Sequence, residues 1–242
     1  MRVPRIFHAG TLQTHDELEL SESAANHVAR VLRMREQAPL IIFNGEGGEF
    51  QARIAVIEKR RVVVTIDEFI ERDIESPLKI TLAQGISRGE RMDYTLQKAV
   101  ELGITRIVPL ITEHCVVDLK GERQAKRLEH WHGIIIGACE QCGRNQLPEL
   151  FPITRLDEWL KEANESKRLL LDHRAEGGIN KLDAAASYTL LIGPEGGLSP
   201  EEQRLAISSG YQGIRLGPRV LRTETAALVA LSALQARFGD LG

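Results

Sequence analysis

The chain has 242 residues, 43% of them hydrophobic and 27% charged, a composition that indicates a globular protein and excludes a disordered or fibrous one. Its 31 basic and 34 acidic side chains give a net charge of −3, so any contact with nucleic acid must use local basic stretches. Three cysteines are too few for a disulfide scaffold, and neither a signal peptide nor an apolar run of about 20 residues is found, so we expect a cytoplasmic protein without a membrane span.

The first third of the chain predicts a small β domain. The expected elements are a helix capped by Ser21 and reaching about Met34, then strands over residues 40–43, 50–57 and 62–66. A glycine-rich turn at 44–48 separates the first two strands. Consecutive short strands of this kind indicate an antiparallel sheet or β-barrel, which we expect to end in the polar segment 71–77.

Beyond Pro77 the pattern changes to alternating strands and helices, which predicts an α/β domain with a parallel sheet covered on both faces. The expected strands are 78–83, 104–110, 167–171, 188–192 and 214–216, and the expected helices are 91–102, 122–141, 199–209 and 223–238. Ser199, Pro200 and Glu202 form a capping box at the start of one helix. We therefore assign residues 1–72 to the β domain and 73–242 to the α/β domain.

Two glycine-rich loops follow predicted strands, IGPEGG at 192–197 and LGPRVLRTETA at 216–226. In open parallel sheets, ligands bind beyond the carboxyl ends of the strands, where backbone without side chains allows close approach. The loops are therefore expected to bracket one small ligand, with ordinary strand–helix turns as the alternative, and a side chain at Gly196 is expected to block that ligand. Neither a phosphate-binding P-loop nor a dinucleotide fingerprint is present, so the ligand should lack a triphosphate.

Several polar groups allow two interpretations. The stretch 27–35 carries three arginines and no acid, and it either contacts RNA phosphates or is a solvated helix face. Asp172 and His173 follow a strand and form either a proton-transfer pair or a solvated loop. Cys139 and Cys142 lack a second pair to complete a zinc site, so we expect inert thiols and no metal.

Three stretches together, 84–103, 192–199 and 216–226, resemble the bacterial 16S ribosomal RNA uridine-N3 methyltransferases of the SPOUT superfamily. Residues 140–144 also fit that family, and the N-terminal part resembles its PUA-like RNA-binding domain. The resemblance implies a knotted SPOUT-type methyltransferase domain with a parallel sheet and a deep trefoil knot, preceded by a PUA-like β-barrel. It further implies S-adenosyl-L-methionine as cofactor, a homodimer, and methylation of one uridine in the decoding region of the small ribosomal subunit.

The same resemblance implies a set of site residues. Those expected to wrap the methyl donor are Leu170, Leu171, Ile192, Gly193, Pro194, Glu195, Gly196, Gly197, Leu216, Gly217, Leu221, Arg222, Thr223, Thr225 and Ala226. Those expected to contact RNA are Arg5, His27, Arg30, Arg33, Arg35 and Arg88.

The chemistry requires removal of the N3 proton of uracil, so we expect Glu224 to accept it, Arg222 to stabilise charge on the carbonyl oxygens, and Arg91 to place the nucleotide. A structural ion pair between Arg222 and Glu224 is the alternative, with the base then coming from the other subunit. Two further functions stay open: a non-catalytic RNA-binding module for ribosome assembly, and a metal-dependent nucleotide hydrolase that uses Glu195 and Asp172.

Overall fold

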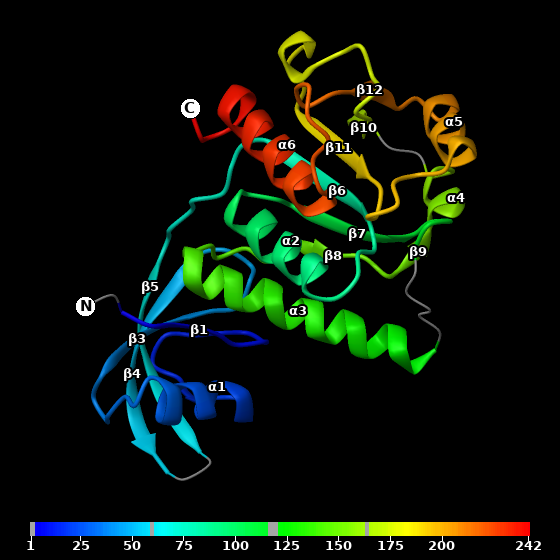
Figure 1. The fold of residues 1–242 in the computed structure, drawn as a ribbon. Coiled ribbons are helices and arrows are strands. Elements are labelled where there is room, and N and C mark those ends of the chain that lie inside the picture. Colours follow the sequence, from blue (N-terminus) through cyan, green and yellow to red (C-terminus); the bar gives the residue numbers. More distant parts are fainter. Residues whose placement is uncertain (1–2, 59–60, 116–120, 163–164) are drawn as a thin grey trace. The chain divides into compact units, whose positions relative to one another are not determined.

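The computed structural model describes residues 3–58, 61–115, 121–162 and 165–242 (Figure 1). The chain divides into two compact units. Unit 1 contains Met1–Glu75 and Cys139–Leu147, and unit 2 contains Ser76–Ala138 and Pro148–Gly242. Each unit has its own sheet, a mixed one in unit 1 and a parallel one in unit 2, which agrees with the predicted fold class.

Unit 1 is a five-stranded mixed sheet. Its strands are β1 (Arg5–Phe7), β2 (Glu17–Glu19), β3 (Pro39–Phe43), β4 (Glu49–Ile57) and β5 (Val62–Ile70), in the order β1-β3-β4-β5-β2. The pair β1–β3 is parallel and the other pairs are antiparallel. Strands β3, β4 and β5 match those expected from the sequence. The edge strands β1 and β2 have three residues each, too few for an alternation of apolar and polar residues to be recognised.

The helix expected from Ser21 to Met34 is wrong in its second half. Only α1 (Glu22–Asn26) is α-helical, and a π-helical turn over His27–Val31 follows it. The turn is widened because the Leu32 N–H bonds to the carbonyl oxygen of His27, five residues back. Arg33 then takes a positive φ of 51°, which ends the helical path.

A segment distant in sequence also belongs to unit 1: the last turn of α3 (Glu122–Cys142) and the residues after it. Asn145 donates a hydrogen bond to Glu49 of β4 over 3.3 Å, and the Arg144 guanidinium pairs with Glu75 with both side chains buried. From the sequence this segment is expected in the α/β half, because the helical pattern over residues 122–141 continues without a break across residue 138.

Unit 2 contains a seven-stranded, all-parallel sheet, as expected. Its strands are β6 (Lys79–Gly85), β7 (Arg106–Ile111), β8 (Glu149–Leu150), β9 (Thr154–Arg155), β10 (Lys167–Leu171), β11 (Ser187–Ile192) and β12 (Gln212–Ile214). The order is β12-β10-β11-β6-β7-β8, and β9 also pairs with β7. The helices besides α3 are α2 (Glu90–Glu101), α4 (Leu156–Trp159), α5 (Pro200–Ser208) and α6 (Thr223–Phe238), with a 3-10 turn at Ile179–Lys181.

Helices pack on both faces of this sheet. Trp159 of α4 and Ala206 of α5 share a buried cluster with Leu191 of β11. Because neighbouring strand residues point to opposite faces, the buried Leu190 and Ile192 face the other side, where α6 packs on β11 and against α2 (Figure 1). The carboxyl ends of β10, β11 and β6 therefore lie next to one another, and their loops surround a shared space.

Candidate functional site

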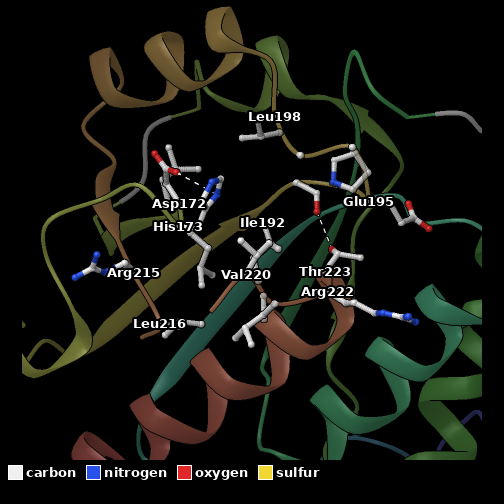
Figure 2. Close-up of a pocket in the computed structure, with 18 of the residues that line it drawn as sticks. Asp172, His173, Ile192, Glu195, Leu198, Arg215, Leu216, Val220, Arg222 and Thr223 are labelled. Carbon is white, nitrogen blue, oxygen red and sulfur yellow. Dashed lines mark hydrogen bonds and ion pairs between the residues drawn. The ribbon is translucent and has the colours of Figure 1, made fainter. Parts of the chain in front are cut away.

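A cavity of about 530 Å3 lies at the carboxyl ends of β10, β11 and β12 in unit 2 (Figure 2). Both glycine-rich loops line it, together with the loop after β10. Thirteen of the fifteen residues expected to hold the cofactor are in its wall: Leu170, Leu171, Ile192, Gly193, Pro194, Glu195, Gly196, Gly197, Leu216, Leu221, Arg222, Thr223 and Ala226. Gly217 and Thr225 are not among the lining residues, whereas Arg91 and Glu224 are.

The loop after β11 is packed without spare room. A Cβ on Gly193 would lie 2.8 Å from the backbone of Gly197 and Leu198, and a Cβ on Gly85 at the end of β6 would lie 2.6 Å from Pro194. These glycines are needed because three backbone segments approach closely here. The Thr223 hydroxyl, at the start of α6, donates to the Gly193 carbonyl oxygen over 2.7 Å.

Glu195 of the same loop is held by the first turn of α2 and by the residue before its N-cap. Its carboxylate accepts from the Arg88 backbone N–H at 2.9 Å and from the Arg91 guanidinium at 2.7 Å. Burial acts to raise the pKa of Glu195, but these N–H donors and the Arg91 charge outweigh it, so the pKa is lowered. Glu195 is therefore a paired anion, which fits a structural role better than the base of a hydrolase.

The neighbouring carbonyl groups face a histidine. His114 Nδ1 lies 3.0 Å from the Gly196 oxygen and 3.2 Å from the Gly197 oxygen. A Cβ on Gly196 would meet the His114 Cβ at 2.9 Å, and His114 is not among the lining residues. A side chain at Gly196 would therefore meet His114 first. The expected loss of the ligand on substitution of Gly196, which lines the cavity, stays a prediction, and Gly193 is the tighter position.

The second loop brings the expected catalytic pair to the cavity. Arg222 occupies the N-cap position of α6, and Figure 2 shows it extending toward the side on which Glu195 lies. Glu224 Oε2 is buried and has no hydrogen-bond partner, although it belongs to a residue of the cavity wall. Within the described residues Arg222 and Glu224 form no ion pair with each other, so the structural alternative for this pair loses its support.

The cavity has further lining residues that were not assigned to it: Asp172, His173, Arg174, Leu198, Gln203, Ile214, Arg215, Arg219 and Val220. Asp172 Oδ1 accepts from the Arg174 backbone N–H at 2.9 Å and lies 3.8 Å from His173 Nδ1. The residues after β10 could have been predicted from the sequence, because ligands bind beyond the carboxyl ends of strands and this rule applies to β10 as well as to β11.

The residues expected to contact RNA separate into two groups. His27, Arg30, Arg33 and Arg35 are exposed around the π-helical turn of unit 1, and Arg88 is exposed in unit 2. Arg5 is a correction: its side chain is only 5% exposed, and its guanidinium bonds to Glu49 at 2.6 Å and to Asn145. A guanidinium that is buried and bonded through both of its terminal nitrogens is not available to a phosphate.

Two remaining expectations concern cysteines and metals. Cys139 is buried, and burial raises the pKa of its thiol to about 12, so the thiol stays protonated and unreactive. Among the residues that the structure describes, no cluster of His, Cys, Asp or Glu is arranged to hold a metal ion. In the same ranges no helix combines the length and apolar character needed to span a membrane.

Comparison with known families matches both parts of the chain. A model described as an RNA methyltransferase domain matches residues 74–235, and one described as an RNA methyltransferase PUA domain matches residues 20–67. Ribosomal RNA small subunit methyltransferase E of Buchnera aphidicola (subsp. Schizaphis graminum) is 39% identical, over 99% of this chain and 98% of its own. The protein of that name from Bacillus subtilis is 29% identical, over 86% of each chain.

Solved structures of similar fold include methyltransferases. A methyltransferase from Legionella pneumophila, determined with its bound cofactor SAM, has a TM-score of 0.96 and 49% identity over the full length of both chains. Ribosomal RNA small subunit methyltransferase E from Neisseria gonorrhoeae, bound to S-adenosyl methionine, has a TM-score of 0.92 and 40% identity, again over both full lengths.

Proposed function

The chain belongs to the RNA methyltransferase family, and from this premise we propose that it transfers the methyl group of S-adenosylmethionine to N3 of one uridine in the 16S ribosomal RNA. The cavity at the ends of β10, β11 and β12 carries the proposal, because both glycine-rich loops line it. Relatives named for small-subunit ribosomal RNA methylation cover nearly the whole chain, and structures of the same shape are determined with this cofactor.

The cavity suits such a cofactor. Its volume of about 530 Å3 is within the usual range for small-molecule sites. Apolar side chains of Leu170, Ile192 and Leu216 line it and suit a flat aromatic group such as adenine, and the backbone of the two loops offers polar groups. When bound, the cofactor supplies a methyl group on a sulfonium, which is electrophilic without metal assistance. The residues expected to wrap it are those of the two loops and Leu171.

Positioning and proton removal are then the tasks of the chain. Uracil N3 carries a weakly acidic proton and attacks the methyl carbon only when that proton leaves. Glu224, with one buried oxygen lacking a partner, accepts the N3 proton. Arg222 stabilises the negative charge that develops on the two flanking carbonyl oxygens. Arg91, fixed by Glu195, lies at the cavity wall where it orients the nucleotide. The N3–C bond forms as the C–S bond breaks.

Unit 1 supplies RNA binding through exposed residues of its own. His27, Arg30, Arg33 and Arg35 are exposed beside the exposed Val31 and Leu32, which gives a surface with both cationic and apolar groups. Such surfaces bind the RNA backbone and its unstacked bases. We place this activity in the cytoplasm, on the ribosomal RNA of the small subunit.

Two implied features remain proposals, the trefoil knot and the homodimer. The segment from β12 to α6 starts at one edge of the sheet, yet the first turn of α6 bonds to Gln84 of β6 and to the Gly193 carbonyl oxygen, both beyond β10. This return of the chain from the edge of the sheet toward its central strands supports the proposal of a knot. The dimer would be checked by sedimentation.

The reaction is tested by incubating the protein with small ribosomal subunits that lack the modification and with methyl-labelled S-adenosylmethionine. Nucleoside analysis of the RNA should recover the label as 3-methyluridine. Binding to the subunit without methyl transfer would instead favour the non-catalytic assembly module. Transfer to another nucleoside would keep the enzyme class and reject the N3 assignment.

A further inference from the structure

The wall of the cavity is strongly cationic although the whole chain is acidic. Five arginines line it, against the three carboxylates of Asp172, Glu195 and Glu224, in a chain of net charge −3. Arg91 is neutralised by Glu195 at 2.7 Å. The other arginines lie in the two loops that follow β10 and β12: Arg174, Arg215, Arg219 and Arg222.

Three of these arginines have no assigned task. The side chains of Arg174, Arg215 and Arg219, which we call the arginine rim, are exposed and make no hydrogen bond or ion pair with any residue of the described ranges. Their loops are joined by backbone, since the Arg215 N–H bonds to the Gly177 carbonyl oxygen at 2.7 Å. The rim therefore brings three guanidinium groups without a counter-charge to the wall of one cavity, on two loops that are held together by their backbones.

The tip of the second loop is open to solvent beside these arginines. Gly217 has a φ of 77°, and a Cβ on it would have no atom within 4 Å, so its backbone is open to close approach. Val220 is 75% exposed, with Arg219 beside it. The single carboxylate of S-adenosylmethionine needs one cation at most, which leaves the remaining charge of the rim without a partner.

The cationic groups Arg215 and Arg222 lie on different sides of the cavity in Figure 2. Arg215 extends outward on the side of Asp172 and His173, whereas Arg222 extends on the side of Glu195. A target base in a folded RNA must be splayed out to expose its Watson–Crick edge, and its strand then crosses the opening with phosphates on both sides of the flipped nucleotide. Arginine matches phosphate through its planar, two-pronged donor geometry.

We propose that the arginine rim binds backbone phosphates of the substrate RNA on the side of the target nucleotide opposite to Arg222. The inference deepens the proposed function and rests on it. The catalytic unit thus reads the position of the strand itself, in addition to the RNA contacts of unit 1. The contact is electrostatic and independent of sequence, so it sets affinity and register rather than base choice.

The test compares a triple variant, R174Q/R215Q/R219Q, with the unaltered protein in binding a fluorescent single-stranded oligouridine over a series of KCl concentrations. Each lost phosphate contact lowers the slope of log affinity against log salt by about 0.7 for single strands, so the slope should fall by about 2. Affinity near physiological salt should fall by about tenfold or more. Cofactor affinity, measured by calorimetry on the same variant, separates phosphate contacts from contacts to the methyl donor.

A matched control carries the same charge change elsewhere in unit 2. R106Q/R155Q/R204Q removes three arginines whose side chains are at least 60% exposed, each paired with an acid and none lining the cavity. Its salt slope should stay that of the unaltered protein.

Three results would overturn the proposal that the arginine rim binds phosphates. They are an unchanged salt slope in the triple variant, a loss of RNA affinity equal to that of the control variant, or an unaltered protein that binds neither oligouridine nor small subunits. A fall in cofactor affinity would assign the arginines to the methyl donor, and a change in sedimentation would assign them to a contact between copies. The binding assay contains no methyl donor, so a failed methyl transfer would reject the reaction without deciding this test.

Discussion

Thr223 and Gly193 are joined by a hydrogen bond of 2.7 Å from the Thr223 hydroxyl to the Gly193 carbonyl oxygen. Gln84 Nε2 donates to the same hydroxyl at 2.9 Å, so the hydroxyl proton is directed at Gly193. The start of α6 and the loop after β11 are thereby held as one unit around the cavity. Gln84 and Thr223 are at least nine-tenths buried, so water cannot replace these bonds.

This link gives the first prediction. Thr223→Val keeps the shape of the side chain but removes the hydrogen bonds that the hydroxyl makes to Gly193 and to Gln84. Gln84 Nε2 keeps only its contacts to the carbonyl oxygens of Gly85 at 3.0 Å and Gly193 at 3.4 Å, so the loss should cost about 1–3 kcal/mol of unfolding free energy. Cofactor affinity should fall by about tenfold. Thr223→Ser retains the hydroxyl and should stay close to the unaltered protein in both measurements, made by urea unfolding and calorimetry. Equal losses in the two variants would show that the methyl group, not the hydroxyl, matters.

Gly193 offers a second prediction, a steric one. Gly193→Ala places a Cβ 2.8 Å from the Gly197 carbonyl carbon and the Leu198 nitrogen, so the loop must move and cofactor binding should be abolished. Gly133→Ala, at an exposed position within α3 with no atom near the new Cβ, should instead stabilise the protein by about 0.5–1 kcal/mol. Calorimetry and thermal unfolding of both variants check this. Normal cofactor affinity in Gly193→Ala would remove the loop from the site.

Local signals account for most of the fold. The capping box at Ser199 forms as expected, with Glu202 and Ser199 bonded to each other's backbone N–H. The buried strand 167–171 is also found where its apolar run predicts it. The features that local patterns do not predict depend on residues that are distant in the sequence. Arg5 reads as an exposed cation until Glu49, 44 residues away, is seen beside it.

Some residues of the site could likewise be predicted from local sequence, and others could not. Glycine and proline mark the two loops in the sequence, and most of their residues line the cavity as expected. The loop after β10 has no such mark next to the strand end, so Arg174 was not linked to Arg215. Their proximity follows from the parallel pairing of β10 with β12, a relationship between strands about 40 residues apart.

A third prediction concerns acid conditions. Because the pKa of Glu195 is lowered in the folded protein, its carboxylate stabilises the fold above about pH 4.5, and this contribution is lost as the pH falls through the lowered pKa. The pair with Arg91 is partly exposed, so the effect should be about 1 kcal/mol or less. The difference in unfolding free energy between the unaltered protein and Glu195→Gln should be largest above pH 4.5 and shrink below it. A difference that grows on acidification would contradict the assigned pairing.

The buried cluster of unit 1 gives a fourth prediction. Glu49→Ala leaves the Arg5 guanidinium buried without its counter-charge, which should cost about 3–5 kcal/mol of unfolding free energy. Asp67→Asn breaks the exposed pair with Arg53 in the same sheet and should cost at most about 1 kcal/mol. Urea unfolding of the two variants measures the contrast. A loss below 1 kcal/mol for Glu49→Ala would mean that water reaches Arg5.

The last prediction separates the roles of Arg222 and Glu224. Glu224→Gln keeps the size of the side chain but cannot accept the N3 proton, so the single-turnover rate of methyl transfer should fall by about 10²–10⁴ while cofactor affinity changes little. Arg222→Gln should slow the same step by about 10²–10³, because charge on the uracil oxygens is no longer stabilised.

If Glu224 is the base, a substrate that loses its N3 proton to solvent more readily depends on it less. Uridine replaced at the target position by an analogue whose N3 proton is more acidic, such as 5-fluorouridine, should restore part of the rate in Glu224→Gln and little of it in Arg222→Gln. Equal recovery in both variants, or none in either, would move the proton acceptor away from Glu224, with a carboxylate of a second subunit as the next group to substitute. The unpartnered, buried Oε2 of Glu224 favours the first outcome, since an idle carboxylate oxygen in that position otherwise lowers stability without a compensating contact.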